Sequence, residues 1–214
     1  MLKSVLNTLD EELSLDGGMM MVTEECCTKI SLLTESYPRY GFDALSMLTA
    51  TGWDALCITR LHPEYVTKKY GLSGTRCLWL SSRRGKGSIS PKSMGHLIRA
   101  IKAELKKNGN LIVFVDGLEY ILMWNDLEKV MSTLKEIDGM MEGKNAEMLI
   151  CIDPLTFEQR DLERLVSEFP TNSTTEVVEI LSNELSQQID GALPESEDQR
   201  IGDLLESGEL HAAP

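Results

Sequence analysis

Two acidic residues follow the most apolar segment of the chain, at a spacing that suits metal and water chemistry. Asp116 comes directly after the apolar run 111–115, and Glu119 lies three residues further on. Ligands of open α/β sheets bind outside the carboxyl ends of the strands, and many nucleotide hydrolases hold a magnesium-associated aspartate there. A nearby glutamate can orient a water molecule. The pair is therefore a candidate site for magnesium and a nucleotide, and a simple Asp-Gly turn is the alternative.

A basic loop supplies candidate ligands for an anion. Residues 82–88 combine glycines, which permit tight turns, with arginines, which bind phosphate oxygens through two parallel hydrogen bonds. Another arginine directly follows the predicted strand 55–59. These residues predict a site for a nucleotide or a phosphometabolite, and a solvated loop is the alternative. The candidate ligand-binding residues are Arg60, Arg83, Arg84, Lys86, Asp116 and Glu119.

The chain lacks the loop with which many ATPases hold phosphates. That loop reads Gly-x-x-x-x-Gly-Lys-Ser/Thr between a strand and a helix, so that backbone amides and the lysine contact the phosphates. Residues 60–66 contain neither glycine nor lysine, and the fragment 85–88 (Gly-Lys-Gly-Ser) lacks the first glycine. ATP hydrolysis by this route is not expected, and no catalytic residue is predicted.

The histidines and cysteines form no motif for a metal. The 3 histidines are scattered and no Cys-x-x-Cys pair occurs, so these residues predict no zinc site. The 5 cysteines follow no disulfide spacing, which is typical of free thiols in a reducing cytoplasm. Three of them fall in predicted strands and are expected to be buried and inert: Cys57, Cys77 and Cys151.

Alternating strands and helices must position these residues. The run 111–115 is apolar throughout, which is typical of a central parallel strand covered on both faces. Short connections to amphipathic helices imply βαβ units, so we predict an α/β fold, a three-layer sandwich with a mainly parallel central sheet. The predicted strands are 19–23, 55–59, 76–81, 111–115, 147–152 and an edge strand 176–181. The predicted helices are 2–13, 42–49, 64–70, 93–107, 127–141 and a last one over 162–169 with Thr156 and Gln159 as its capping box, while 30–37 is ambiguous and 37–41 is a loop.

Composition divides the chain into three parts. An amphipathic helix lies within 1–16, a single α/β domain spans 17–182, and 183–214 is an acidic tail that we expect to be flexible. The net charge of −13 argues against a nucleic-acid partner, although 56–107 carries 12 basic and 2 acidic residues. That basic block either faces an anion or balances the acidic parts of the folded chain. No apolar run is long enough to cross a bilayer and no secretory signal is visible, so we expect a cytoplasmic protein without membrane insertion.

Several ordered motifs resemble a known family, from about residue 19 to about residue 181. They read Gly-Trp-Asp-Ala-Leu-Cys-Ile-Thr-Arg at 52–60, His-Pro-Glu at 62–64, Lys-Tyr-Gly-Leu at 69–72, Leu-Trp-Leu-Ser at 78–81, Ile-Ser-Pro at 89–91, Val-Phe-Val-Asp-Gly-Leu-Glu-Tyr-Ile at 113–121, Asn125, and Ile-Asp-Pro at 152–154. This combination resembles the archaeal family known as domain of unknown function 835.

The resemblance implies a relative of the RecA and circadian-clock ATPases that has lost its phosphate loop. Members of the family occur as stand-alone archaeal proteins and attached to signalling modules such as histidine kinases. The resemblance thus implies a cytoplasmic regulatory module, and it carries over no catalytic residue. Under it, Asp116 matches the acidic strand end of the ATPases, while the chain from Arg60 onward departs from the phosphate loop.

Three functions remain open at this point. The favoured one is a non-catalytic regulatory or scaffold module of archaeal signal transduction that binds an unknown protein, with a homodimer through the first helix as one form of partner. The alternative is a nucleotide- or phosphometabolite-binding protein that uses loop 82–88 and Asp116, with magnesium, and without ATP hydrolysis. The third is a nucleic-acid contact through residues 56–107, which steep salt dependence would reveal.

Overall fold

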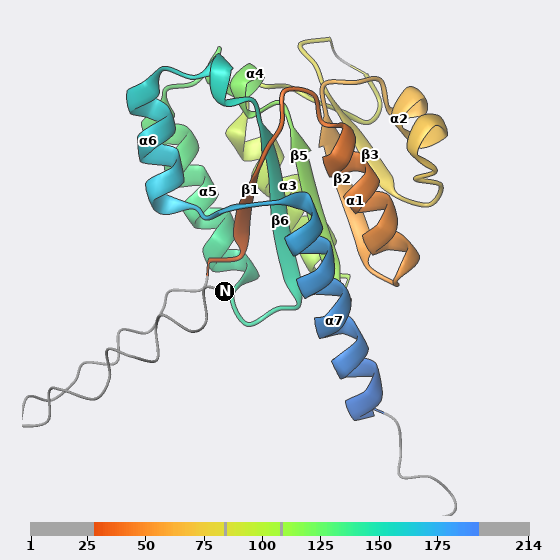
Figure 1. Cartoon of the computed structure of the whole chain (residues 1–214). Helices are drawn as coiled ribbons and strands as arrows, with labels where there is room; N and C mark the ends of the chain where they lie inside the picture. Colours follow the sequence, from red (N-terminus) through yellow and green to blue (C-terminus); the bar gives the residue numbers. More distant parts are fainter. Residues whose placement is uncertain (1–27, 84, 108, 193–214) are drawn as a thin grey trace, which may run out of the picture.

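A parallel sheet forms the centre of the molecule. The computed structural model describes residues 28–83, 85–107 and 109–192, with side chains up to residue 183. The described strands run in the order β4-β3-β2-β5-β6-β1-β7, and all neighbours are parallel. Helices cover both faces, so the predicted α/β sandwich is confirmed (Figure 1).

The strands and helices have the following bounds. The strands are β1 (Ile30–Thr34), β2 (Asp54–Thr59), β3 (Arg76–Leu80), β4 (Ser88–Ile89), β5 (Leu111–Asp116), β6 (Ala146–Ile152) and β7 (Thr171–Asn172). The α-helices are α1 (Arg39–Ala50), α2 (Pro63–Tyr70), α3 (Met94–Leu105), α4 (Leu118–Leu122), α5 (Leu127–Met141), α6 (Gln159–Glu168) and α7 (Thr174–Ala192), and a 3-10 helix, η2, spans Pro154–Thr156.

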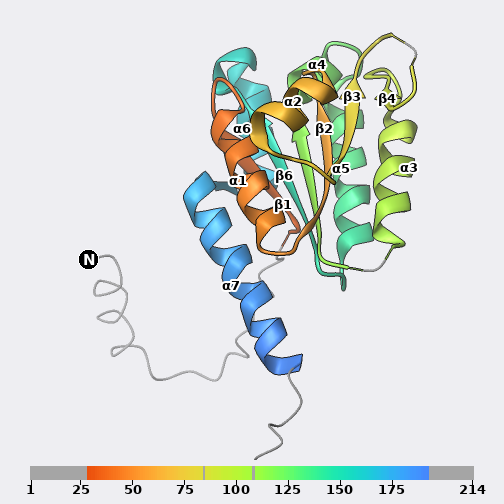
Figure 2. The same ribbon diagram turned by 90° about the vertical axis from the view of Figure 1, so that its right-hand side faces the viewer.

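The two faces of the sheet bury different side chains. Helices α1, α2 and α7 enclose a core that contains Phe42, Phe114 and Cys57. On the other face, α3, α4, α5 and α6 enclose a mainly aliphatic core that includes Val113 and Val115. Figure 2 shows α1, α2 and α7 on one side of the sheet, and α3 and α5 on the other. Because successive side chains of a strand point to opposite faces, β5 contributes to both cores and is buried at every position, as its sequence predicts.

The prediction of an edge strand at 176–181 is wrong, because these residues lie in α7. Val177 and Leu181 are both buried, at the i, i+4 spacing of a helix face, and the Leu181 carbonyl accepts the indole N–H of Trp53 at 3.3 Å. Ser173 and Glu176 form a capping box that starts this helix: each side chain accepts the other's backbone N–H. The edge position belongs to β7, and α7 continues past the predicted domain boundary at 182 as far as Ala192.

The predicted cap of the helix over 162–169 is also wrong. Thr156 donates its hydroxyl to the Asp153 carbonyl at 2.7 Å, and the Asp153 carboxylate accepts the backbone N–H of Leu155 at 3.0 Å. These bonds and Pro154 form η2, so α6 begins only at Gln159 and has Glu158 at its N-cap. A short 3-10 turn here takes the place of the expected capping box.

Other boundaries move by a few residues. The ambiguous segment 30–37 contains β1, and α1 begins inside the predicted loop 37–41. The helix predicted over 93–107 ends at Leu105. The predicted helix 2–13, the predicted strand 19–23 and the tail beyond residue 192 lie outside the described residues.

Candidate functional site

The carboxyl ends of β2 and β5, called the crevice below, are the place where an open sheet of this kind accepts a ligand. The two strands are neighbours, but the chain leaves β2 for α2 on one face and leaves β5 for α4 and α5 on the other. Connections that part in this way mark the usual ligand position of open sheets, at the carboxyl ends of the strands. Arg60 follows β2 and Gly117 follows β5, so both border this crevice.

Asp116 is fully engaged in the crevice. Its carboxylate accepts a hydrogen bond from the Arg60 guanidinium at 2.9 Å through Oδ1, and one from the Thr59 hydroxyl at 2.7 Å through Oδ2. The Asp116 side chain is only 2% exposed, whereas that of Arg60 is 39% exposed. A buried carboxylate requires such partners, because burial without a compensating charge costs several kcal/mol, on the order of 3–5 kcal/mol when one partner is removed.

Glu119 shares the same guanidinium. Its Oε1 forms an ion pair with the second terminal nitrogen of Arg60, while its Oε2 is buried and accepts no hydrogen bond from the described residues. Burial raises the pKa of the Glu119 carboxyl, and the negative charges of Asp116 and Asp153 raise it further. Its own backbone N–H and Arg60 lower the pKa, but they do not offset the burial.

Gly117 makes room for the Arg60 side chain. Its φ is 113°, a conformation that other residues rarely adopt, and a Cβ atom there would lie 2.5 Å from the Cγ of Arg60. The arginine therefore passes directly over the backbone that follows β5. The Asp-Gly pair at the end of an apolar strand is the sequence signal of this close approach.

Trp79 and Thr59 also shape the crevice, and neither is among the six candidate ligand-binding residues. The indole N–H of Trp79 donates to the Arg60 carbonyl at 3.0 Å, and its ring meets His62 edge-on at 5.2 Å between centroids. Thr59 accepts the backbone N–H of Leu61 in addition to its bond to Asp116. A polar residue at the last position of an otherwise apolar strand was the available signal for Thr59.

The structure does not join the basic loop to this cluster. Arg83 and Lys86 are exposed, and among the described residues neither side chain forms a hydrogen bond or ion pair. The loop is held by Ser88, whose hydroxyl accepts the N–H of Gly85 at 2.9 Å and donates to its carbonyl. Arg84 lies outside the described residues. Of the six candidates, Arg60, Asp116 and Glu119 contact one another, and no contact among the described residues joins Arg83 or Lys86 to them.

Large apolar side chains are exposed along this edge of the sheet. They belong to segments that follow strands, and in a parallel sheet these segments lie at one edge (Figure 1, near α4). Leu155 is 90% exposed and Met123 is 74% exposed. Several large apolar side chains exposed at one edge favour an interaction site more than a single exposed side chain does. The carboxyl-edge surface, as we call it, comprises Tyr37, Tyr40, Tyr65, Met123, Trp124 and Leu155.

Cations lie against the aromatic rings of the carboxyl-edge surface. The Lys69 ammonium is 5.5 Å from the ring centre of Tyr37 and 5.3 Å from that of Tyr65. A hydrogen bond that the ammonium donates to the Tyr65 hydroxyl oxygen is the largest cause that raises the pKa of Lys69. Lys92 lies 3.8 Å from the ring centre of Trp124 on the other side of the edge. Such contacts hold a flexible cation in place and leave part of its charge available to a partner.

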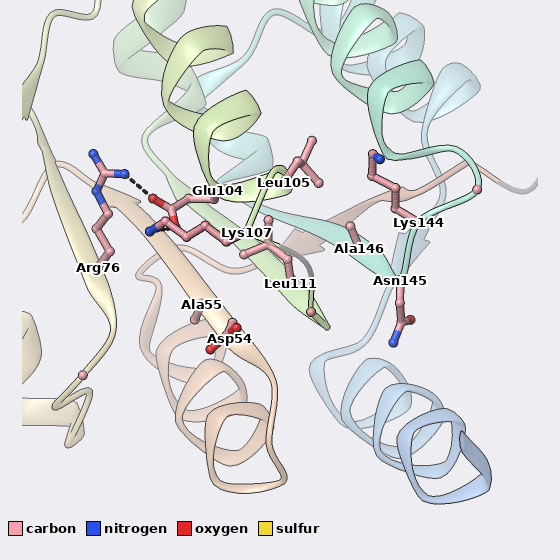
Figure 3. A pocket seen from close by; sticks show the side chains of 13 residues that line it. Asp54, Ala55, Arg76, Glu104, Leu105, Lys107, Leu111, Lys144, Asn145 and Ala146 are labelled. Carbon is pink, nitrogen blue, oxygen red and sulfur yellow. Dashed lines mark hydrogen bonds and ion pairs between the residues drawn. The ribbon is translucent and has the colours of Figure 1, made fainter. Parts of the chain in front are cut away.

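A separate cavity of about 410 Å³ opens at the amino ends of β2, β3, β5 and β6. Figure 3 shows Arg76 and Glu104 facing each other at one side of it, with Lys144 and Asn145 at the other. Lys107 also binds Glu104, at 2.6 Å. This cavity is therefore polar and mixed in charge, and it lies at the opposite edge from the crevice.

The part of the chain that the structure covers shows neither a cluster of metal-ligating side chains nor a membrane-spanning helix. Within the described ranges, no group of three or more histidine, cysteine, aspartate or glutamate side chains is arranged to hold a metal ion. The helices described there are all too short or too polar to cross a membrane.

One comparison with known proteins gave a match. A family model described as “Protein of unknown function (DUF835)” matches residues 35–169, more than half of the chain. No curated protein and no solved structure matched. The matched range contains Arg60, Asp116 and Glu119 and ends before α7. The kinship with RecA-type ATPases stays a prediction.

Proposed function

The chain belongs to the DUF835 family, and we propose that it is a non-catalytic regulatory or scaffold module that binds a protein partner through its carboxyl-edge surface. The observation that carries the proposal is the set of exposed aromatic and apolar side chains at that edge, with cations lying against the rings. Tyrosine, tryptophan and methionine are enriched at protein interfaces. A role in archaeal signal transduction follows from the family resemblance alone.

The occupied crevice supports a non-catalytic role. A magnesium ion at Asp116 would have to replace the Arg60 guanidinium, and the other carboxylate oxygen already accepts from Thr59. The backbone of Gly117 lies under Arg60 and keeps it in place. The polar groups at the usual ligand position therefore satisfy one another.

The charge of the surface favours an acidic partner. Arg39, Lys69 and Lys92 each lie against a ring of the carboxyl-edge surface, and Lys86 is exposed on the neighbouring loop. We therefore propose a protein segment in which acidic side chains alternate with apolar ones. Complementary charge would speed association, and the aromatic side chains would supply most of the affinity.

An affinity capture with two double variants tests this function. Trp124→Ala/Leu155→Ser removes two side chains of the carboxyl-edge surface. Met47→Ser/Ile180→Ser is the matched control, since it removes two exposed apolar side chains from α1 and α7. Each protein is immobilised, incubated with lysate of the source cells, and its captured proteins are quantified by mass spectrometry.

We expect a partner that the wild type and the control retain and that the edge variant loses at least about tenfold, as for the loss of an interface anchor. Capture that higher salt weakens would support the charge argument. A partner retained equally by both variants would overturn the carboxyl-edge surface as the binding face. Capture that nuclease treatment abolishes would assign the surface to a nucleic acid instead.

A phosphorylated metabolite or nucleotide is the second candidate ligand. The observation that favours it is the exposure of Arg83 and Lys86, which have no partner among the described residues. A thermal-shift series with ATP, ADP, GTP and cyclic nucleotides, with and without magnesium, tests it. A ligand at 100 times its dissociation constant stabilises the fold by roughly 2.7 kcal/mol. A shift that survives Arg83→Ala/Arg84→Ala/Lys86→Ala would exclude the loop, and the absence of any shift would remove this candidate.

A further inference from the structure

Cys57 and Cys77 lie opposite each other on neighbouring strands. Cys57 is in β2, Cys77 is in β3, and the two are register partners in the parallel ladder. Both are free cysteines, and both belong to the core under α1 and α2. Because register partners of a parallel pair project to the same face of the sheet, their thiols are neighbours.

The separation of the strands suits a disulfide. Neighbouring strands lie about 4.8 Å apart, and disulfide-bonded residues have Cα atoms at roughly 4.4–6.8 Å. The two thiols affect each other's proton affinity: Cys77 raises the pKa of Cys57, and Cys57 lowers the pKa of Cys77. Neither strand has to change its register for the two sulfurs to bond.

Cys77 has the features of the reactive partner. It is half-buried, whereas Cys57 is fully buried. The neighbouring Cys57 thiol and the Thr67 hydroxyl, which lies 3.7 Å from the Cys77 sulfur, together lower the pKa of the Cys77 thiol to about 7, against the effect of its partial burial. The thiolate is the nucleophilic form of cysteine, so Cys77 departs from the inert, buried thiol that the sequence predicted.

We propose that Cys57 and Cys77 form an oxidisable dithiol that takes a small peroxide as its oxidant. The Cys77 thiolate attacks one oxygen of hydrogen peroxide and breaks the O–O bond, and the departing hydroxide takes up a proton to become water. The Cys57 thiol then attacks the sulfur of the resulting sulfenic acid, which forms the S–S bond and releases a second water. Two electrons pass from the two thiols to the peroxide, and a small dithiol such as dithiothreitol reverses the reaction.

Cys151 provides a matched internal control. It is also a buried strand cysteine, and its sulfur lies 3.3 Å from Oε1 of Glu35. Burial and the negative charge of Glu35 raise its pKa well above the ordinary value. Cys151 is therefore expected to stay reduced under the same treatment.

Intact-mass and peptide analysis of the folded chain tests the proposal. The full chain, with Cys26→Ser and Cys27→Ser, is treated with hydrogen peroxide, denatured in N-ethylmaleimide and analysed by mass spectrometry. We expect the loss of two hydrogen atoms, one maleimide adduct instead of three, and a peptide that links residues 57 and 77. Adding Cys151→Ser should leave the crosslink unchanged. The oxidation should be about tenfold faster at pH 8 than at pH 6, because the thiolate fraction of Cys77 rises over this range.

Single variants separate the two roles. Cys57→Ala should remove the crosslink and leave a Cys77 sulfenic acid that dimedone traps, formed more slowly because the thiol that lowers the pKa of Cys77 is gone, whereas Cys77→Ser should remove both products. Circular dichroism spectra verify that each variant is folded. Three maleimide adducts after treatment of the folded chain, or a crosslink that includes Cys151, would overturn the proposal. Because its readout is covalent, it stands or falls independently of the proposed partner.

Discussion

Two clusters at opposite edges of the sheet combine carboxylates and cationic side chains in reversed proportion. At the carboxyl edge, the single guanidinium of Arg60 is shared by Asp116 and Glu119. At the amino edge, the single carboxylate of Glu104 is shared by Arg76 and a neighbouring lysine. The first cluster has one negative charge more than positive, and the second has one positive charge more.

The two glutamates show what this proportion does. Burial raises the pKa of Glu119, and the charge of Arg60, which also pairs with Asp116, does not offset this rise. Burial also acts on Glu104, which is only 9% exposed, but hydrogen bonds from Lys107 and Arg76, with their charges, lower its pKa below the ordinary value. The comparison teaches that the number of cations per carboxylate, rather than burial alone, decides which form of a buried glutamate the fold favours.

Removal of the shared Arg60 guanidinium should cause the largest loss of stability. Arg60→Met keeps the alkyl chain but leaves the buried Asp116 without its cation. We expect the free energy of unfolding to fall by about 3 kcal/mol, the lower end for broken buried pairs, because the guanidinium itself is partly exposed. Urea unfolding at pH 7, followed by circular dichroism, measures this loss.

Arg99→Met is the control for that experiment. Arg99 is an exposed residue of α3, and we expect its replacement to change stability by no more than about 0.5 kcal/mol. If Arg60→Met were as mild as this control, the crevice cluster would behave as a surface ion pair and the comparison between the two edges would fail.

Replacement of the glycine under Arg60 should cause the second largest loss of stability. Gly117→Ala places a Cβ atom at a φ of 113° and 2.5 Å from the Cγ of Arg60, so we expect a loss of about 2 kcal/mol. Part of this loss comes from the displaced arginine, so the double variant with Arg60→Met should lose less than the sum of the two single changes. Strict additivity would show that only backbone strain acts at Gly117. The control is Gly139→Ala in α5, where a Cβ meets nothing within 4 Å and a gain in stability is expected.

Substitutions in the amino-edge cluster should reduce stability less than those at Arg60 and Gly117. In Arg76→Met, Glu104 keeps its ion pair with Lys107, whose side chain is 63% exposed. In Lys107→Met, Glu104 keeps its ion pair with Arg76. We expect each single change to cost less than about 1 kcal/mol, and 1 M salt to reduce the difference further. Urea midpoints at two salt concentrations measure this. A cost as large as that of Arg60→Met would contradict the comparison.

The sequence predicted the central fold because its signals there are local and strong. The uninterrupted apolar run of β5 cannot be reconciled with a surface position, and the residue after it must lie at the carboxyl edge. From this, Arg60, Asp116 and Glu119 were expected at one edge. That Arg60 pairs with both acidic residues depends on β2 and β5 being neighbours, and strand order is a long-range property that the sequence does not state.

The errors of the sequence analysis have a physical origin. The apolar residues of 176–181 fit both a strand and a helix, and only the packing of Val177 and Leu181 against the rest of the core selects the helix. Ser173 and Glu176 form a capping box just before the apolar residues, and this motif would have indicated a helix. Cys77 was expected to be buried, but β3 has only the two-residue β4 beyond it in the sheet, and this cysteine remains half-buried.

The smallest expected effects concern the pH dependence of stability, which should have opposite signs for Glu119 and Glu104. The raised pKa of Glu119 means that the folded chain binds this proton more tightly than the unfolded chain does. Its stabilising contribution is complete below the ordinary value of 4.5 and is lost as the pH rises through the folded value. The lowered pKa of Glu104 means the reverse: its contribution is present above 4.5 and is lost as the pH falls through the folded value.

Each glutamate is therefore compared with its glutamine variant across this range. The stability of the wild type relative to Glu119→Gln should fall as the pH rises from 4.5 toward neutrality, so that at pH 7 this variant is at least as stable as the wild type. The stability of the wild type relative to Glu104→Gln should instead fall as the pH drops below 4.5. Urea midpoints between pH 3.5 and pH 7 give both curves. Two curves with the same slope would mean that burial alone sets the proton affinity of both groups, and that the reversed proportion of charges at the two edges has no energetic consequence.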